Sequence, residues 1–356
     1  MTRLEHLDSY RTDFEAWLEE IEPAPRGAWW RLDVSAFYPT SGGQQHDTGD
    51  VHALGRNYRV ADVTLRDGEV WHLVTAAEDV ATEDVAAESA TATLGAAVTG
   101  RVDWSRRFRH MQRHTAQHLL SQAFVRLDVA YATRSVALSG ADLTLDLAGD
   151  PDDDAIAEAE RQVNDVAARA LPIRAFEIDE ASVPLYPLRR PPKVRGRIRV
   201  VAMGTWEHSA CGGTHLRSTA EALPVLVTGR ERVRGDLVRV TFRAGLEAIA
   251  HASATGRAAA AAAALLSSAV PDLPARVEAL QRGTAEARRR IAALERDVAD
   301  ALAIRLVGAA GDEVVVHLLE GDDTALLTPL ADALAARGAT AALGARDGCA
   351  ARVVLA

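Results

Sequence analysis

The spacing of apolar residues changes character twice along this chain of 356 residues, so its parts must fold in different ways. Residues 1 to about 95 carry short apolar stretches, such as Trp29–Val34 and Tyr58–Val63, separated by Gly, Asp and Asn. Short strands with turn residues between them pack into a small barrel or sandwich. Beyond about residue 246 the chain becomes alanine-rich and helical in pattern. This length and pattern predict two or three domains.

Between these regions, helices mix with mostly antiparallel strands. Phe108–Leu127 contains neither Pro nor Gly and predicts a long helix, whereas Leu143–Leu147 alternates with polar residues like a strand. Asp152–Asp154 give an acidic start to a second helix. The predicted fold class is therefore α+β. Its predicted domains are a β-barrel-like domain at 1–95, an α+β core at 96–248, a helical or coiled-coil linker at 249–308 and a small C-terminal α/β domain, cut short, at 309–356.

A heptad-like repeat lies in the alanine-rich region. Its members are spaced alternately by four and three residues, which gives the 3.5-residue period of a coiled-coil seam. They are Leu273, Val277, Leu280, Thr284, Ala287, Ile291, Leu294, Val298 and Ala301. Gly283, Thr284 and the alanines weaken the seam. Residues 273–301 therefore predict either a homodimer or an intramolecular hairpin with Leu246–Ser268.

Composition and the N-terminal residues predict a cytoplasmic protein without a membrane partner. No stretch approaches the roughly 18 to 20 uninterrupted apolar residues of a membrane helix. The acids among the first 22 residues do not suit a secretory signal. Only two cysteines occur, Cys211 and Cys349, and their wide separation argues against a disulfide scaffold and for a reducing compartment.

Positive charge is concentrated although the net charge is −10. Residues 186–245 hold twelve basic side chains against four acids, and 101–113 hold five arginines against one acid. Such local fields attract phosphates even on an acidic protein. From these clusters Arg113, Arg195 and Arg197 are candidates for substrate binding. Strands with solvated arginine faces are the alternative.

Two short motifs, His114-x-x-x-His118 and Cys211-x-x-x-His215, contain the ligand types that Zn²⁺ prefers. Positions i and i+4 of a helix lie on one face, so His114 and His118 can point two imidazoles at one ion. The Gly-Gly pair after Cys211 lets the backbone fold tightly round a metal. The combination predicts a zinc site formed by all four residues. The alternative is a buried structural thiol with unrelated histidines.

The role of such an ion stays open from these residues alone. Four protein ligands describe a closed structural site, whereas a catalytic site keeps a position open for substrate or water. With a loose or additional ligand, the ion could polarise an ester carbonyl. His110, one helical turn before His114, and His208, three residues before Cys211, are further candidates for ligands, ligand partners or phosphate contacts, or are plain surface residues.

A third motif is Phe37-Tyr-Pro-Thr-Ser-Gly-Gly-Gln-Gln-His-Asp-Thr-Gly49, whose Pro and Gly residues predict a tightly shaped turn. Its backbone amides, with Ser41 and Gln44, could hold a phosphate or position a substrate. Gly42 and Gly43 are therefore candidates for substrate binding. A plain β-turn is the alternative.

Taken together, these segments resemble the editing region of alanyl-tRNA synthetase, and most closely its free-standing relatives, the AlaX trans-editing proteins in their long form. The resemblance spans roughly residues 30 to 250, and the region from 246 to 356 is similar in layout. It rests on motifs in a fixed order: the loop 37–49, Val102-Asp103-Trp104, His110-Met-Gln-Arg-His-Thr-Ala-Gln-His-Leu-Leu-Ser121, Cys211-Gly-Gly-Thr-His215 and 239–245.

The resemblance implies a zinc-dependent aminoacyl-tRNA deacylase, a carboxylic ester hydrolase that acts in trans on mischarged tRNA for alanine. Seryl esters are the main expected substrate and glycyl esters a second candidate, with the acceptor stem of tRNA(Ala) as partner. It also implies Zn²⁺ ligation by His114, His118, Cys211 and His215. The family often has an Asp before the cysteine, and here Glu207 is the nearest acid that could orient a ligating histidine.

Polar residues beside the ligands are the candidates for catalysis. Thr115, Gln117 and Thr214 flank the ligands and, with Gln44, could read the substrate's amino group or hydroxyl. A pocket that rewards a hydroxyl would reject alanine, which leaves polar groups unpaired. Two alternatives are an editing deacylase for another tRNA, of the threonyl type, and a non-catalytic RNA-binding module with a structural zinc.

Overall fold

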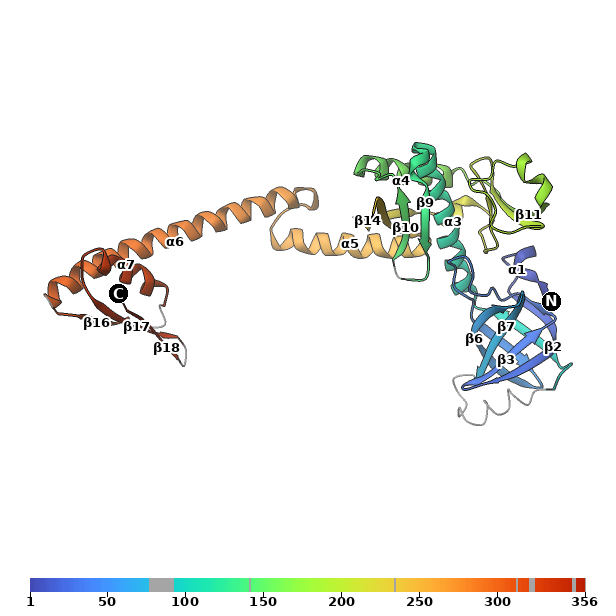
Figure 1. Cartoon of the computed structure of the whole chain (residues 1–356), viewed down its shortest axis with the longest axis horizontal. Helices are drawn as coiled ribbons and strands as arrows, with labels where there is room; N and C mark the ends of the chain where they lie inside the picture. The colour runs from blue at the N-terminus through green and yellow to red at the C-terminus, as the bar shows by residue number, and fades with distance from the viewer. Residues whose placement is uncertain are drawn as a thin grey trace. The chain divides into compact units, whose positions relative to one another are not determined.

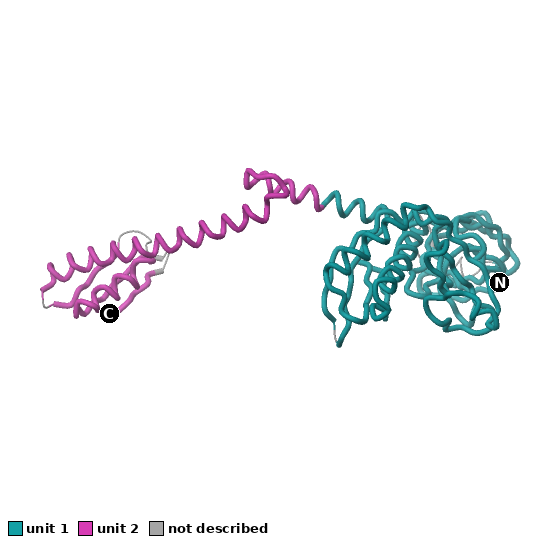
Figure 2. The backbone as a smooth tube through the Cα atoms, turned by 90° about the horizontal axis from the view of Figure 1, so that it is seen from above, with its two compact units in different colours: residues 1–254 teal, residues 255–356 magenta. Residues whose placement is uncertain are grey.

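The structure is a computed structural model that describes residues 1–76, 93–140, 142–233, 235–311, 313–319, 324–347 and 350–355. It divides into two compact units, Met1–Ala254 and Thr255–Ala356, which Figure 2 colours separately. The predicted mixture of helices and strands is confirmed, including a closed barrel in the first unit. Arg234 and Cys349, which contributed to the charge and cysteine counts, lie outside the described residues.

The barrel closes in the order β2-β3-β7-β6-β5-β8, with every neighbouring pair antiparallel (Figure 1). Its strands are β2 (Asp13–Ala24), β3 (Gly27–Leu32), β5 (Gly49–Ala53), β6 (Arg56–Arg66), β7 (Glu69–Ala76) and β8 (Ala97–Val102). Alternate side chains, such as Trp30, Val60 and Val74, are fully buried inside it. Because β8 pairs with both β2 and β5, the barrel continues past residue 95 to Val102.

Helix α3 (Trp104–Leu127) follows the barrel directly and starts earlier than Phe108. The reason is Asp103, whose carboxylate accepts a hydrogen bond from the Arg106 amide and caps the helix. Together with α4 (Asp153–Ala168), α3 packs on an antiparallel sheet in the order β14-β15-β10-β9. The strands of this sheet are β9 (Thr133–Ala137), β10 (Leu143–Ala148), β14 (Val225–Arg232) and β15 (Leu237–Ala244).

A second, smaller sheet carries the segment that leads to Cys211. It consists of β11 (Ile173–Asp179), β12 (Arg197–Met203) and β13 (Glu207–Ala210), antiparallel in that order. A 3-10 helix, η2 (Glu180–Leu185), and a loop join β11 to β12. Short elements complete the unit: β1 (Thr2–Arg3), α1 (Leu4–Leu7), β4 (Val34–Ser35), η1 (Val129–Tyr131) and η3 (Thr219–Ala222).

A buried ion pair joins the barrel to α3. Arg107 of α3 and Asp47 of the loop before β5 both have side chains without solvent exposure. The Arg107 guanidinium donates to both carboxylate oxygens of Asp47, and the Tyr38 amide donates to the same carboxylate at 2.7 Å. Arg107 also donates to the backbone carbonyls of Ser9 and Ala36. The loop from Phe37 to Asp47 is therefore fixed against α3.

The second unit is an α/β module. Helix α5 (Gly245–Leu265) crosses the division at Ala254, and η4 (Val270–Asp272) then leads into the long α6 (Leu273–Ala310). The end of α6 packs with α7 (Leu327–Ala335), which follows η5 (Thr324–Leu326), over the core of this unit. Its sheet holds β16 (Val315–Leu318), β17 (Ala341–Asp347) and β18 (Ala350–Leu355), with β16 and β17 parallel.

The predicted seam lies along α6. The side chains of Val277, Leu280, Ile291, Leu294 and Val298 are 41% to 58% exposed, so no described segment of the second unit covers them. The homodimer through this seam stays a prediction. Among the described helices, no single one is long and apolar enough to cross a membrane. The segments Gly245–Leu265 and Val270–Ala310 meet the criterion only when taken together, and the chain bends by 74° between them.

Candidate metal centre

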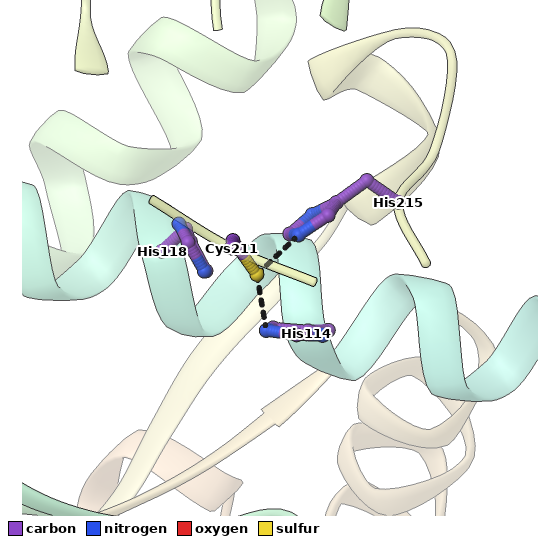
Figure 3. A group of neighbouring side chains, drawn as sticks. All are labelled: His114, His118, Cys211 and His215. Atoms are coloured by element: carbon purple, nitrogen blue, oxygen red, sulfur yellow. Dashed lines mark hydrogen bonds between the residues drawn. The ribbon is translucent and has the colours of Figure 1, made fainter. Parts of the chain in front are cut away.

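Four side chains from two distant segments meet beside α3 (Figure 3). His114 and His118 lie one turn apart on α3, while Cys211 and His215 lie in the segment that follows β13. Their ligand atoms all lie within 4.8 Å of one another. The Cys211 Sγ is 3.4 Å from Nε2 of His114 and 3.4 Å from Nε2 of His215. The two predicted motifs therefore form one cluster.

The cluster has the dimensions of a zinc site. In a tetrahedral site with Zn–N near 2.0 Å and Zn–S near 2.3 Å, a sulfur and a nitrogen ligand lie about 3.5 Å apart. The 3.4 Å separations between Cys211 and two histidines match this spacing. The segment that carries Cys211 can lie this close to His114 only because residue 213 is glycine. A Cβ there would lie 2.1 Å from Cε1 of His114. The donor set thus fits Zn²⁺.

Each of the three histidines has its Nδ1 atom hydrogen-bonded to a different partner. The pairs are His114 with Gln44 Oε1 at 2.8 Å, His118 with Glu207 Oε1 at 3.2 Å and His215 with Thr115 Oγ1 at 3.2 Å. A ring whose Nδ1 donates a hydrogen bond keeps its lone pair on Nε2. Such partners orient metal-ligating histidines and fix their tautomer. All three Nε2 atoms are therefore available to one ion.

Glu207 is the charged member of this set of partners. Its buried carboxylate accepts hydrogen bonds from Arg189 Nε at 2.7 Å and Ser209 Oγ at 2.6 Å in addition to His118. Burial alone would raise the pKa of Glu207. The positive charges of His118 and Arg189 lower it by more than burial raises it, so the pKa lies below the ordinary value. The carboxylate therefore stays charged, and the contact with a ligating histidine expected of Glu207 is present.

The electrostatics of the cluster favour the thiolate. Burial opposes ionisation of Cys211, yet the imidazoles of His114, His118 and His215 lower its pKa well below the ordinary value of a thiol. Burial lowers the pKa of His118, but Glu207 and Cys211 outweigh it and raise that pKa overall. Thiolate is the form of cysteine that binds metals.

Three of the predicted catalytic residues are buried around the ligands rather than in the pocket lining. Gln44 and Thr214 are buried against each other, with Gln44 Nε2 donating to Thr214 Oγ1 at 2.8 Å. Thr115 is buried beside His215 and also accepts a hydrogen bond from the Leu216 amide. Gln44, Thr115 and Thr214 therefore contact the ligands or the loop that carries them.

A pocket of about 650 Å³ opens over the cluster, which is a typical size for a small-molecule site. His114, His118 and Cys211 form part of its lining, together with the predicted Gln117. Three further segments line it: residues 41–43 of the barrel loop, 133–136 of β9 and 189–194 of the loop before β12. Gly42 and Gly43 have φ of +57° and +88°, so the first segment is a turn that favours glycine.

The predicted basic residues are placed differently from one another. Arg113 is buried and bound through two nitrogens to Glu247 of α5, at 2.7 and 2.8 Å, away from the pocket lining. Arg197 lines the pocket but pairs with Glu177, and Arg195 is exposed outside the lining. His110 and His208 lie outside the group of converging ligand atoms.

Sequence reasoning missed several side chains of the pocket wall. Arg134 of β9 and His6 of α1 both line the pocket. No motif surrounds either residue, so only the tertiary arrangement reveals them. The run from Arg189 to Lys193 offered a usable signal, because two adjacent prolines hold a cluster of cations in an exposed loop.

We expect Gln44→Met to weaken zinc binding by about 10 to 100-fold, the usual cost of removing a ligand's hydrogen-bond partner. Methionine keeps most of the volume but cannot accept the hydrogen bond from Nδ1 of His114. Competition with a chromophoric chelator measures the affinity. Gln45→Met is the matched control, because Gln45 is only partly buried and has no hydrogen-bond partner within the described residues. Equal affinities for both variants would contradict the assigned role of Gln44.

Known proteins resemble this chain both locally and over most of its length. The sequence model of the family described as "Threonyl and Alanyl tRNA synthetase second additional domain" matches residues 198–241, which include Cys211 and His215. Alanine–tRNA ligase of Pyrobaculum calidifontis is 32% identical over 332 residues, or 90% of this chain and 35% of the ligase. The ligase of Archaeoglobus fulgidus is 31% identical over 358 residues, which cover 97% of this chain and 37% of the ligase. The ligase of Hyperthermus butylicus is 29% identical over 335 residues, which cover 89% of this chain and 34% of the ligase. The chain thus spans about a third of the length of these curated relatives.

Proposed function

The chain is an AlaX-like relative of alanyl-tRNA synthetase, as its motifs indicated, and on this basis we propose that it is a zinc-dependent aminoacyl-tRNA deacylase. The substrate we propose is tRNA(Ala) mischarged with serine, and with glycine as a second candidate. The protein would act in trans in the cytoplasm and bind the acceptor stem.

One observation carries this proposal: three of the four clustered ligand residues, His114, His118 and Cys211, line a pocket of about 650 Å³, a volume suited to an aminoacyl-adenosine. When bound by His114, His118, Cys211 and His215, Zn²⁺ would supply polarisation of the ester carbonyl or a ligand position for the substrate's amino group. Ester hydrolysis is intrinsically easy, so a well-positioned substrate needs no nucleophilic side chain.

The protein's own residues would divide two tasks. Gln44, Glu207 and Thr115 would hold the three imidazoles in one orientation through their Nδ1 atoms. Gln117 faces the pocket, and its amide nitrogen donates to Ser121 Oγ at 2.9 Å, which leaves the amide oxygen as an acceptor.

We therefore propose that Gln117 accepts a hydrogen bond from the serine hydroxyl, with Thr133 beside it in the same wall. Thr133 Oγ1 donates to the same Ser121 hydroxyl at 2.8 Å, so the three side chains form a connected network. Bound alanine would leave the Gln117 oxygen without a partner, which disfavours its ester.

The remaining parts have proposed roles as well. The core between the barrel and residue 248 would carry the reaction, with the Gly42–Gly43 turn supplied by the barrel domain, which extends to Val102. The linker at 249–308 and the module at 309–356 would serve contacts with tRNA or, through the 273–301 seam, with a second copy.

A second candidate function follows from the ligand count. Four protein ligands can saturate a tetrahedral zinc, which favours a structural ion in a non-catalytic RNA-binding module. The matching family description also covers threonyl synthetases, so a threonyl-type editing deacylase is a further alternative.

The test is hydrolysis of seryl-tRNA(Ala) and alanyl-tRNA(Ala) by the zinc-loaded full chain and by the chelated chain. We expect rapid loss of serine, sparing of alanine and no activity after chelation. A folded, zinc-containing protein that binds tRNA but hydrolyses neither ester would establish the binding module instead. Preferential hydrolysis of seryl-tRNA(Thr) would favour the threonyl type.

A further inference from the structure

Ion pairing separates the basic residues of this chain into two kinds. In the basic region from Tyr186 to Gly245, seven arginines have carboxylate partners within 4.0 Å. They are Arg189, Arg197, Arg217, Arg230, Arg232, Arg239 and Arg243. Most of the local positive charge is thus neutralised within the fold, and the remaining cations are the ones that can attract an external anion.

Two cations of this region and one from elsewhere in the chain line the pocket over the metal centre without an ion-pair partner in the part of the chain that the structure describes. Arg190 and Lys193 lie on the loop before β12, and Arg134 lies on β9 in another part of the lining. Among the ion pairs of the described residues, none involves these three side chains, and all three are exposed. Lys193 is also the only lysine of the chain.

The charges of this group act on one another. Partial loss of water contact lowers the pKa of Arg190 first, and the positive charges of Arg189 and Arg134 lower it further. Two acids lie near this group, and both are already engaged: Glu207 is bound to Arg189, Ser209 and His118, and Glu177, which lines the same pocket, pairs with Arg197. Like charges gathered without their own counter-ion are stabilised when an anion binds between them.

The loop that carries two of these cations is anchored. The Arg189 amide donates to the His208 carbonyl at 2.9 Å, and Leu188 forms a parallel bridge with His208 of β13. Pro191 and Pro192 restrict the backbone between Arg190 and Lys193. By contrast, the Arg199 guanidinium is occupied by the carbonyls of Cys211 and Gly213, at 2.9 and 3.0 Å. Arg199 therefore holds the segment that carries Cys211 and is not counted among the cations that could bind an external anion.

We propose that Arg134, Arg190 and Lys193 form an anion site for the phosphodiester that joins the 3′-terminal adenosine of the aminoacyl-tRNA to the preceding nucleotide. The inference rests on the proposed function and identifies how that substrate is held. In an aminoacyl-tRNA the amino acid's carboxylate is esterified, so phosphodiesters are the only anions near the reacting bond. Guanidinium groups recognise phosphate oxygens well.

The variants Arg134→Gln and Arg190→Gln test this site in the zinc-loaded full chain. We expect each to raise KM for seryl-tRNA about 10-fold with little change in kcat. The salt dependence of tRNA binding becomes shallower by about 0.7 in log–log slope for each lost single-strand contact. Hydrolysis of 3′-O-seryl-adenosine, which has no phosphate, stays unchanged. Arg174→Gln is the matched control, because Arg174 is an exposed arginine of β11 outside the pocket lining.

A binding experiment separates this proposal from the proposed function. We compare an uncharged RNA oligonucleotide ending in CCA with the same oligonucleotide carrying a neutral methylphosphonate at the last linkage. The wild type should bind the methylphosphonate about 10-fold more weakly, and a triple variant carrying Arg134→Gln, Arg190→Gln and Lys193→Gln should bind both RNAs equally. That result supports the anion site even if the wild type hydrolyses no ester. Equal wild-type binding to both RNAs, or equal losses on seryl-tRNA and seryl-adenosine, would overturn it.

Discussion

Cys211→Ala is expected to abolish both zinc binding and seryl-tRNA deacylation. The substitution removes the only sulfur ligand of the cluster, whose atom lies 3.4 Å from Nε2 of two histidines. Loss of a ligand should exceed the 10 to 100-fold effect of losing a ligand's hydrogen-bond partner. Because three buried imidazoles would remain close together without an anion between them, residual affinity for zinc should be low.

The measurement combines bound zinc per chain with single-turnover hydrolysis of seryl-tRNA(Ala). Cys349→Ala, at the only other cysteine, should keep full zinc content and activity. Circular dichroism of Cys211→Ala distinguishes loss of the ion from loss of the fold, and Cys211→His restores a fourth nitrogen ligand if the variant with alanine does not fold. Retained deacylation by folded, zinc-free Cys211→Ala would refute zinc dependence.

Asp47→Asn is expected to be the most damaging single change for stability. It would leave the Arg107 guanidinium charged, without solvent exposure and without its carboxylate. Removing one partner of a buried pair typically lowers the free energy of unfolding by about 3 to 5 kcal/mol. The Tyr38 amide would also lose its charged acceptor.

Denaturant unfolding followed by tryptophan fluorescence suits this test, since all six tryptophans lie at or before residue 206, within the first unit. Asp50→Asn provides the control, because Asp50 pairs with Arg59 at the surface, where both side chains are more than a third exposed. Its effect should stay within about 1 kcal/mol. Similar losses for the two variants would show that the buried pair does not anchor the loop.

The sequence predicted what depends on local periodicity. Spacing of four placed His114 and His118 on one helical face, and the alternation at Leu143–Leu147 indicated the strand that the structure contains as β10. The Gly-Gly pair after Cys211 indicated a backbone that can fold tightly round a metal, and in the structure Gly213 lies directly against the His114 ring.

Contacts between distant segments could not be predicted in the same way. Gln44 reaches His114 across 70 positions of sequence, whereas the contact of Glu207 with a ligating histidine, which joins residues 89 positions apart, was expected only through the family resemblance. Charge counting had the same limit: Arg113 belonged to a basic cluster, yet the fold neutralises it with Glu247. Arg134 belonged to neither cluster, yet it lines the pocket.

The three partners of the histidines come from separate structural layers: Gln44 from the barrel loop, Thr115 from α3 and Glu207 from β13. A preorganised site for the ion therefore exists only when barrel, helix and sheet have docked. Ion occupancy and docking are then thermodynamically linked, and each must strengthen the other to the same extent. Free zinc at a hundred times its dissociation constant would hold the docked state by about 2.7 kcal/mol. The measured affinity for the ion would thus report how completely the barrel, helix and sheet of the first unit have docked.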